Sequence, residues 1–197
     1  MDLDTLWLHT LEEVVNRAAH EVKDSLNGVS LNVEVVRVRA RPGVNTDGGG
    51  LAAFATAAAE QLELLTVRAE ALLFLSRPPR EPADVGLALR HLAALLIPAA
   101  KADGKRLVVD GYGRSAPTSA SAQATRLALG AGLLAVLQGD HSGRCQLEQN
   151  GEIVVRFSHE SAGACSLDPA VSAAIQQHDI RSDLSNGELR LRFPATS

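Results

Sequence analysis

Residues 20–30 read His-Glu-Val-Lys-Asp-Ser-Leu-Asn-Gly-Val-Ser, and they lie midway along a segment that has the apolar period of a helix. Apolar side chains recur in this segment every three or four residues, at Leu8, Leu11, Val15, Ala18, Val22, Leu26, Val29, Val33 and Val36. The spacing predicts one long amphipathic helix over about residues 4–39. At 100° per residue, His20 falls about 165° from the centre of that stripe, on the side expected to face solvent.

Polar residues share the expected solvent side of this helix with His20. They are Asn16, Lys23, Asp24 and Asn27. An imidazole beside a carboxylate, an ammonium and an amide can be reached by another protein, whereas a core histidine cannot. A lone histidine on a solvated face usually has no function. Whether a function is assigned to His20 therefore depends on the residues around it.

A second long helix is predicted after the Gly-rich break at residues 41–50, which cannot be helical throughout. It should run from about Leu51 to Ser76, with its apolar stripe at Leu51, Phe54, Ala58, Leu62, Leu65, Ala69 and Leu72. A hairpin of two such helices leaves part of its apolar seam uncovered, and each buried Leu or Val contributes roughly 1.5–3 kcal/mol. Pairing with a second copy would bury the seam, so we predict a homodimer in which two hairpins form an antiparallel four-helix bundle.

After the Pro-rich residues 76–82, the long helical patterns give way to shorter segments with helix and strand periods. Helices are predicted over about residues 84–96, 120–137 and 169–177, and strands over 106–111, 144–148, 152–157 and 188–193. Helices on one face of a mixed sheet make an α+β sandwich. We therefore expect two domains, a helical hairpin over residues 1–78 and an α/β sandwich over residues 79–197.

The composition of the chain limits which classes of partner and which cellular compartment are expected. The 197 residues are 46% hydrophobic and 3% aromatic, and the net charge of −4 shows no excess of basic residues of the kind that binds nucleic acid. The cysteines, Cys145 and Cys165, are too few for a disulfide framework and lack the spacing of metal ligands. Without a signal peptide or a long apolar run, the sequence predicts a cytoplasmic protein that does not cross a membrane.

The stretch around His20 resembles the H box of sensor histidine kinases. In that family an acidic, an aliphatic and a basic residue follow the phosphoacceptor histidine, as Glu21, Val22 and Lys23 follow His20 here. Ser25 stands where proline is usual and Asp24 where threonine or asparagine is usual. Members of the family dimerise through a hairpin of this kind, which agrees with the prediction from periodicity.

The order of elements after residue 79 resembles the ATP-binding domain of the same kinases, but the nucleotide-binding residues are missing. Ala131 and Ala135 occupy the positions of the asparagines that bind Mg²⁺ and phosphate, and His159 replaces the aspartate that holds the adenine amino group. The second glycine-rich box and the lid are also absent between residues 167 and 180. These losses predict a degenerate domain that binds no ATP and supports no autophosphorylation.

A dimeric hairpin with an H-box-like helix and a degenerate ATP-binding-like domain resembles the histidine phosphotransferases of bacterial phosphorelays. The resemblance implies that His20 carries the phosphoryl group and that Glu21 holds the reactive tautomer of its ring. It also implies that Lys23, Asp24 and Asn27 contact response-regulator receiver domains. No cofactor is expected on this chain, and Mg²⁺ is expected on the partner receiver.

Other interpretations remain open. One is a pseudo-kinase scaffold or inhibitor that docks on a kinase or receiver without carrying phosphate. Another is a true kinase with an unusual nucleotide site, and a third is an unrelated coiled-coil adaptor in which His20 is incidental. Labelling from a phosphorylated receiver separates phosphotransfer from docking.

Overall fold

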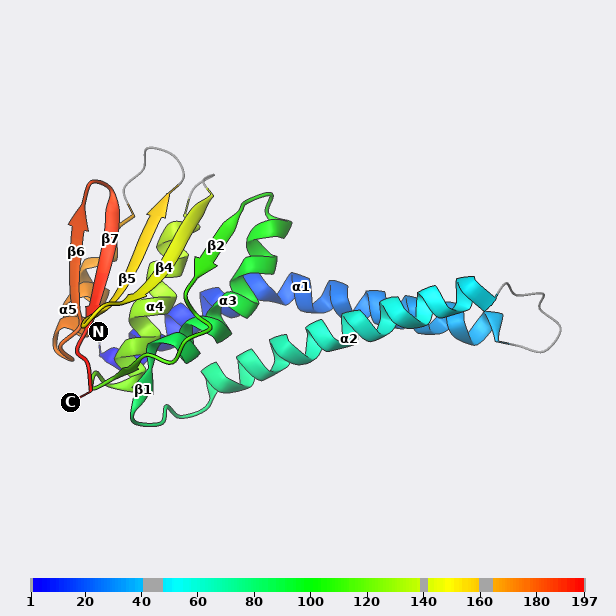
Figure 1. Cartoon of the computed structure of the whole chain (residues 1–197), viewed down its shortest axis with the longest axis horizontal. Helices are drawn as coiled ribbons and strands as arrows, with labels where there is room; N and C mark the ends of the chain where they lie inside the picture. The colour runs from blue at the N-terminus through cyan, green and yellow to red at the C-terminus, as the bar shows by residue number, and fades with distance from the viewer. Residues whose placement is uncertain (1, 41–47, 139–141, 160–164, 197) are drawn as a thin grey trace.

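A helical hairpin projects from an α+β body in the computed structural model, which describes residues 2–40, 48–138, 142–159 and 165–196 (Figure 1). The hairpin consists of α1 (Leu3–Arg39) and α2 (Gly48–Ser76). Asp2 caps α1 by accepting a hydrogen bond from the backbone N–H of Thr5 at 2.8 Å. Both predicted helices are confirmed, although α2 begins at Gly48, earlier than predicted. The remainder of the predicted break, residues 41–47, lies outside the described residues.

A five-stranded mixed sheet with the strand order β2-β4-β5-β7-β6 forms one layer of the body. Its strands are β2 (Leu107–Asp110), β4 (Gly143–Gln149), β5 (Ile153–His159), β6 (Arg181–Ser185) and β7 (Glu188–Phe193). β2 and β4 pair in parallel, and the other neighbours are antiparallel. Two short strands, β1 (Ala83–Asp84) and β3 (Pro117–Thr118), pair beside the sheet. The mixed α+β class is confirmed, while β1, β3 and β6 were not predicted.

Helices cover one face of this sheet (Figure 1). They are α3 (Val85–Ala102), α4 (Ala122–Val136) and α5 (Pro169–Gln176). The core between the layers includes Leu92 and Leu133 of the helices and Phe157 of β5, all fully buried. Gly132 is needed at this contact, because a Cβ atom there would lie 2.6 Å from the Phe157 ring.

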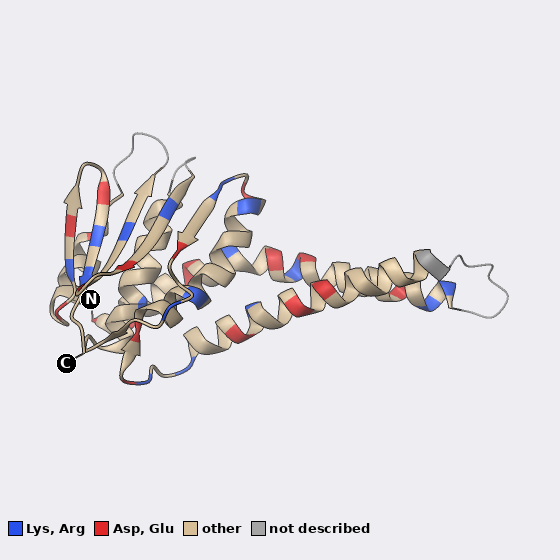
Figure 2. Cartoon of the chain, in the orientation of Figure 1, with Lys and Arg blue, Asp and Glu red and all other residues tan. Residues whose placement is uncertain are grey.

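The other face of the sheet carries charged side chains in ion pairs. Arg156 of β5 lies 3.1 Å from Glu148 of β4 and 3.3 Å from Glu188 of β7, and Arg190 contacts the same Glu188 at 2.6 Å. Figure 2 shows charges of both signs spread over the body and the hairpin. The sheet is therefore apolar toward the helices and polar toward solvent, as one-sided sheets are.

The N-terminal turns of α1 pack against the body rather than against α2 alone. A Cβ atom at Gly130 of α4 would lie 2.9 Å from Cγ2 of Thr10 and 3.5 Å from the Trp7 ring, so glycine allows the close approach of the two helices. The buried core is continuous and includes Leu6 and Leu75 of the hairpin together with residues of the body. The division into domains at residue 78 stays a prediction, and the packing continues across it.

By length and composition, α3 is apolar enough to span a membrane. In the structure it is a core helix, and more than half of its 18 residues are buried inside the protein. Asp84 caps it by accepting a hydrogen bond from the backbone N–H of Leu87 at 2.9 Å. The burial accounts for its hydropathy without a lipid environment.

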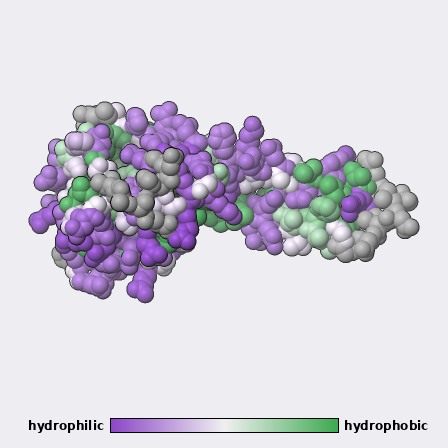
Figure 3. All heavy atoms as spheres, turned by 90° about the horizontal axis from the view of Figure 1, so that it is seen from above, coloured by the Kyte–Doolittle hydropathy of each residue, from purple (hydrophilic) through white to green (hydrophobic). Residues whose placement is uncertain are grey.

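The stripe predicted on α1 divides into a covered edge and an open edge. Ala18 is buried, whereas four large side chains that lie within about 20° of one another around the helix remain exposed. We define the open apolar face as Leu8, Val15, Leu26 and Val33 of α1 with Leu62 and Leu73 of α2. Figure 3 shows hydrophobic surface gathered on the hairpin. A single chain therefore leaves large apolar side chains of both hairpin helices in contact with water.

Candidate functional site

His20 lies exposed in the middle of α1, held by a helix that runs without interruption from Leu3 to Arg39. Lys23, Asp24 and Asn27 are exposed on the same side, where the helical period places them. A helix of this length fixes the position of the imidazole better than a loop does. Four of the residues that the sequence singled out, His20, Lys23, Asp24 and Asn27, therefore share one solvent-facing surface.

Glu21 turns away from this surface toward α2. Its carboxylate lies 3.7 Å from the guanidinium of Arg68, whose residue is only 7% exposed. Within the described part of the chain, Glu21 and His20 share no hydrogen bond. The role of Glu21 in holding the imidazole tautomer stays a prediction, and it requires the carboxylate to leave Arg68 for the ring.

Arg68 is a functional candidate that sequence reasoning missed. Its Nη1 donates to the backbone carbonyl of Glu21 at 3.0 Å and also contacts the hydroxyl of Ser25. The same hydroxyl donates to the Glu21 carbonyl at 2.8 Å. This cluster locks α2 to α1 one residue after His20, and it uses the serine that replaces the usual proline.

A second missed candidate is Leu31, which is 66% exposed. Eleven residues are about three helical turns, so Leu31 lies on the same face of α1 as His20. About 16 Å along the helix axis separates it from His20, a distance that one docked protein domain could span. The hydrophobic period gave no indication of it, because Leu31 stands outside the stripe.

The positions predicted to have lost nucleotide binding lie where α4 meets α1. Ala131 and Ala135 line a cavity of about 280 Å³ together with Leu6, Thr10 and Glu13 of α1. Its charged and imidazole-bearing lining residues are His9, Glu13 and Asp168. None of the lining residues that the structure describes is a lysine or an arginine, which a polyphosphate requires, and the volume falls just below the usual range of roughly 300–1,000 Å³ for ligand pockets.

The other predicted features of the nucleotide region are only partly within the described residues. His159 ends β5, and residues 160–163 lie outside the described part of the chain. Among the residues described, no group of three or more His, Cys, Asp or Glu side chains is placed to hold a metal ion. Cys145 and Cys165 are free and buried, and burial raises the pKa of the Cys165 thiol to about 12. A thiol with that pKa is protonated at neutral pH and is a poor nucleophile.

Comparisons with known proteins find similarity among solved structures alone. No family model matches the sequence, and no curated protein matches it. Among solved structures, 53 chains match. One is the histidine kinase AdeS of Acinetobacter baumannii, at a TM-score of 0.41 and 14% identity, with 90% of this chain and 98% of that chain covered. This overlap is too loose to argue from, so the function below is inferred from the residues of this chain.

Proposed function

We propose that this chain is a histidine phosphotransferase of two-component signalling, which relays a phosphoryl group between receiver domains through His20. The observation that supports the proposal most is the exposed imidazole of His20, fixed on a continuous helix within an H-box-like sequence. The cluster of Arg68, Glu21 and Ser25 behind it holds the two helices in register.

The chemistry follows from a neutral imidazole with one free ring nitrogen. Nε2 of His20 attacks the phosphorus of an aspartyl phosphate in line, forming a P–N bond as the bond to the aspartate oxygen breaks. The aspartate leaves as a carboxylate, and the proton on Nδ1 stays on the ring, where Glu21 would accept a hydrogen bond from it. Charge on the transferring group is stabilised by the receiver, whose Mg²⁺ supplies the countercharge. The second transfer is the reverse of the first, onto another receiver.

The open apolar face supports dimerisation in this proposal. Leu26 and Val33 of α1 and Leu62 of α2 are each about half exposed in a single chain. Covering them with the same face of a second copy gives a two-fold four-helix bundle. His20 lies about 120° around α1 from the exposed edge of its stripe. Both imidazoles of such a dimer would remain accessible to receivers.

The direct test uses receiver domains phosphorylated on aspartate with radiolabelled phosphate. Incubation should transfer label to this chain, and the product should be labile in acid and stable in base, as phosphohistidine is. Labelling of the chain supports the phosphotransferase. Stable binding of a receiver without any labelling favours the scaffold alternative.

Glu21→Ala should slow this transfer without abolishing it. A group that orients the imidazole assists the nucleophile but does not replace it. Rapid-quench measurement of transfer from a phosphorylated receiver gives the rate constant directly. Glu21→Gln, which retains an acceptor oxygen, should be less impaired than Glu21→Ala. Equal rates for all three proteins would remove Glu21 from the mechanism.

Mg-ATP should not bind. The site that resembles a nucleotide pocket is partly filled by α1, and Ala131 and Ala135 provide no ligand for Mg²⁺. Calorimetric titration of the full chain with Mg-ATP should show no heat of binding. A dissociation constant in the micromolar range would contradict this expectation and return the true-kinase alternative to consideration.

A further inference from the structure

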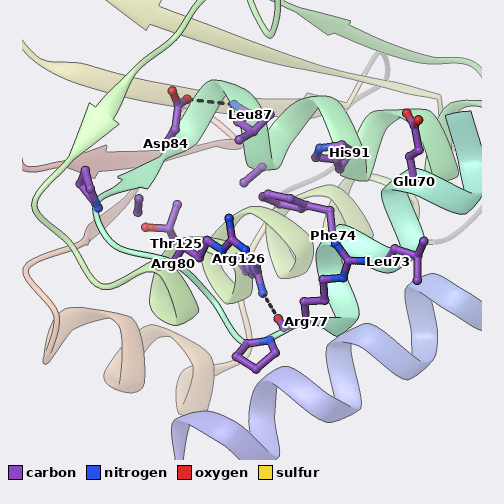
Figure 4. Close-up of a pocket in the computed structure, with 15 residues that line it drawn as sticks. Glu70, Leu73, Phe74, Arg77, Arg80, Asp84, Leu87, His91, Thr125 and Arg126 are labelled. Atoms are coloured by element: carbon purple, nitrogen blue, oxygen red, sulfur yellow. Dashed lines mark hydrogen bonds between the residues drawn. The ribbon is translucent and has the colours of Figure 1, made fainter.

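We propose that the pocket where the end of α2 meets α3 and α4 binds a small organic carboxylate with an apolar body. This pocket has a volume of about 600 Å³ and lies on the side of α4 that carries Thr125 and Arg126 (Figure 4). It is distinct from the smaller cavity at Ala131 and Ala135, and it takes no part in the proposed phosphotransfer. Its volume falls in the range of small-molecule sites, roughly 300–1,000 Å³.

Arg126 is the residue that points to an anion. It is only 5% exposed, and burial lowers the pKa of its guanidinium. Among the residues that the structure describes, no carboxylate lies within ion-pair distance of it. Its partners among the described residues are the carbonyl oxygen of Arg77, to which Nη1 donates at 2.8 Å, and the ring of Phe74, whose centroid is 4.7 Å from Cζ. A buried cation with so little compensation is costly unless a ligand completes the pairing.

The unused donors of Arg126 open on the pocket. A guanidinium carries five N–H donors, and one is used on the carbonyl of Arg77. None of its nitrogens is both fully buried and unbonded, and Arg126 lines the pocket, so its remaining N–H groups are available to an occupant. The planar fork of arginine matches a carboxylate, which it can bind through two parallel hydrogen bonds.

The charges around Arg126 favour the same ligand. The side chains of Arg77 and Arg80 also line the pocket. Of the lining carboxylates, Asp84 is already engaged by the N–H groups of Leu87 and Ala116 at 2.9 and 3.2 Å. Glu70 lies at the far side, beyond His91 (Figure 4). The pocket therefore presents more positive than negative charge to an occupant.

The walls supply the apolar part of the recognition. Phe74 is stacked on the imidazole of His91 with ring centroids 4.2 Å apart, and the flanking side chains include Leu73, Leu87 and Pro78. Leu73 and Leu87 are 50% and 38% exposed, so an apolar ligand would cover surface that is now wet. A flat or aliphatic group bearing one carboxylate satisfies both the walls and Arg126.

The test titrates the full chain with 2-naphthoate and with octanoate, and uses 2-naphthamide as a neutral match in size and shape. Calorimetry should show saturable binding of at least one acid, and 2-naphthamide should bind about tenfold more weakly than 2-naphthoate or worse. Arg126→Met should reduce the affinity for the acids by a similar factor. Arg90→Gln is the control, because Arg90 is an exposed residue of α3 that does not line the pocket.

A structural role for Arg126 predicts different results. If its function is only to hold the carbonyl of Arg77, Arg126→Met should lower the melting temperature. The unmodified protein should then bind neither acid in preference to the neutral amide. On our proposal the melting temperature of the free protein is kept or raised, because an unpaired buried charge is removed. If that variant fails to fold, Arg77→Gln carries the test, since Arg77 is exposed and its carbonyl is retained. The proposal is overturned if neither acid binds up to millimolar concentration, or if acid and amide bind equally well.

Discussion

His20→Gln should eliminate labelling from a phosphorylated receiver while leaving the fold intact. The carboxamide of glutamine has no nucleophilic nitrogen, so phosphoryl transfer loses its acceptor atom. Stability should survive, because His20 is exposed on the face of α1 away from the α2 seam, where substitutions usually change stability by no more than about 0.5 kcal/mol. Radiolabel transfer measures the first effect and thermal unfolding the second.

His9 provides a matched control on the same helix. It is also exposed, and it lies outside the H-box-like sequence. His9→Gln should therefore accept label at the rate of the unmodified protein. If His20→Gln accepts label equally well, His20 is incidental and the phosphoryl carrier lies elsewhere or does not exist.

Leu62→Asp should convert the predicted dimer into monomers. Leu62 is 53% exposed in the single chain, so an aspartate there remains solvated and the chain can still fold. In a four-helix bundle the same carboxylate would be buried without a partner in each of the two copies, which costs about 3–5 kcal/mol per site. Analytical ultracentrifugation at micromolar concentration should show the dimer lost while circular dichroism shows the helices retained.

Leu64→Asp separates this effect from a general loss of helix stability. Leu64 is on the same helix and is 55% exposed, but two residues turn the side chain by about 200° away from Leu62. The variant should remain dimeric. A stable monomer for the unmodified protein at micromolar concentration would contradict the dimer altogether.

The sequence predicted the helices and strands whose buried side chains recur at a regular spacing along the chain. The two helices of the hairpin and the strands β4 and β5 carry such signals. The β6 strand carries none, because four of its five residues are exposed and no alternation of apolar side chains marks it. It forms by pairing with β7 at the edge of the sheet, and that pairing is a tertiary contact.

The candidate site shows the same division. The exposed face around His20 could be read from the helical period, since the period fixes which residues share a side. Arg68 could not, because it reaches Glu21 and Ser25 from more than forty residues further along the chain. The packing of Trp7 and Thr10 on Gly130 could not be predicted either. An amphipathic pattern shows which side of a helix is buried, but it does not identify the element that covers that side.

The packing of α1 on α4 also places the α+β body close to His20 along the helix axis. Thr10, wedged against Gly130, precedes His20 by less than three turns, or about 15 Å along the helix axis. A domain of about 100 residues has a radius of gyration of about 13 Å, so in the proposed phosphotransfer a receiver docked on His20 would have part of its mass beside the α+β body. In that proposal the shape of the body would limit which receivers fit beside His20, in addition to the residues that they contact.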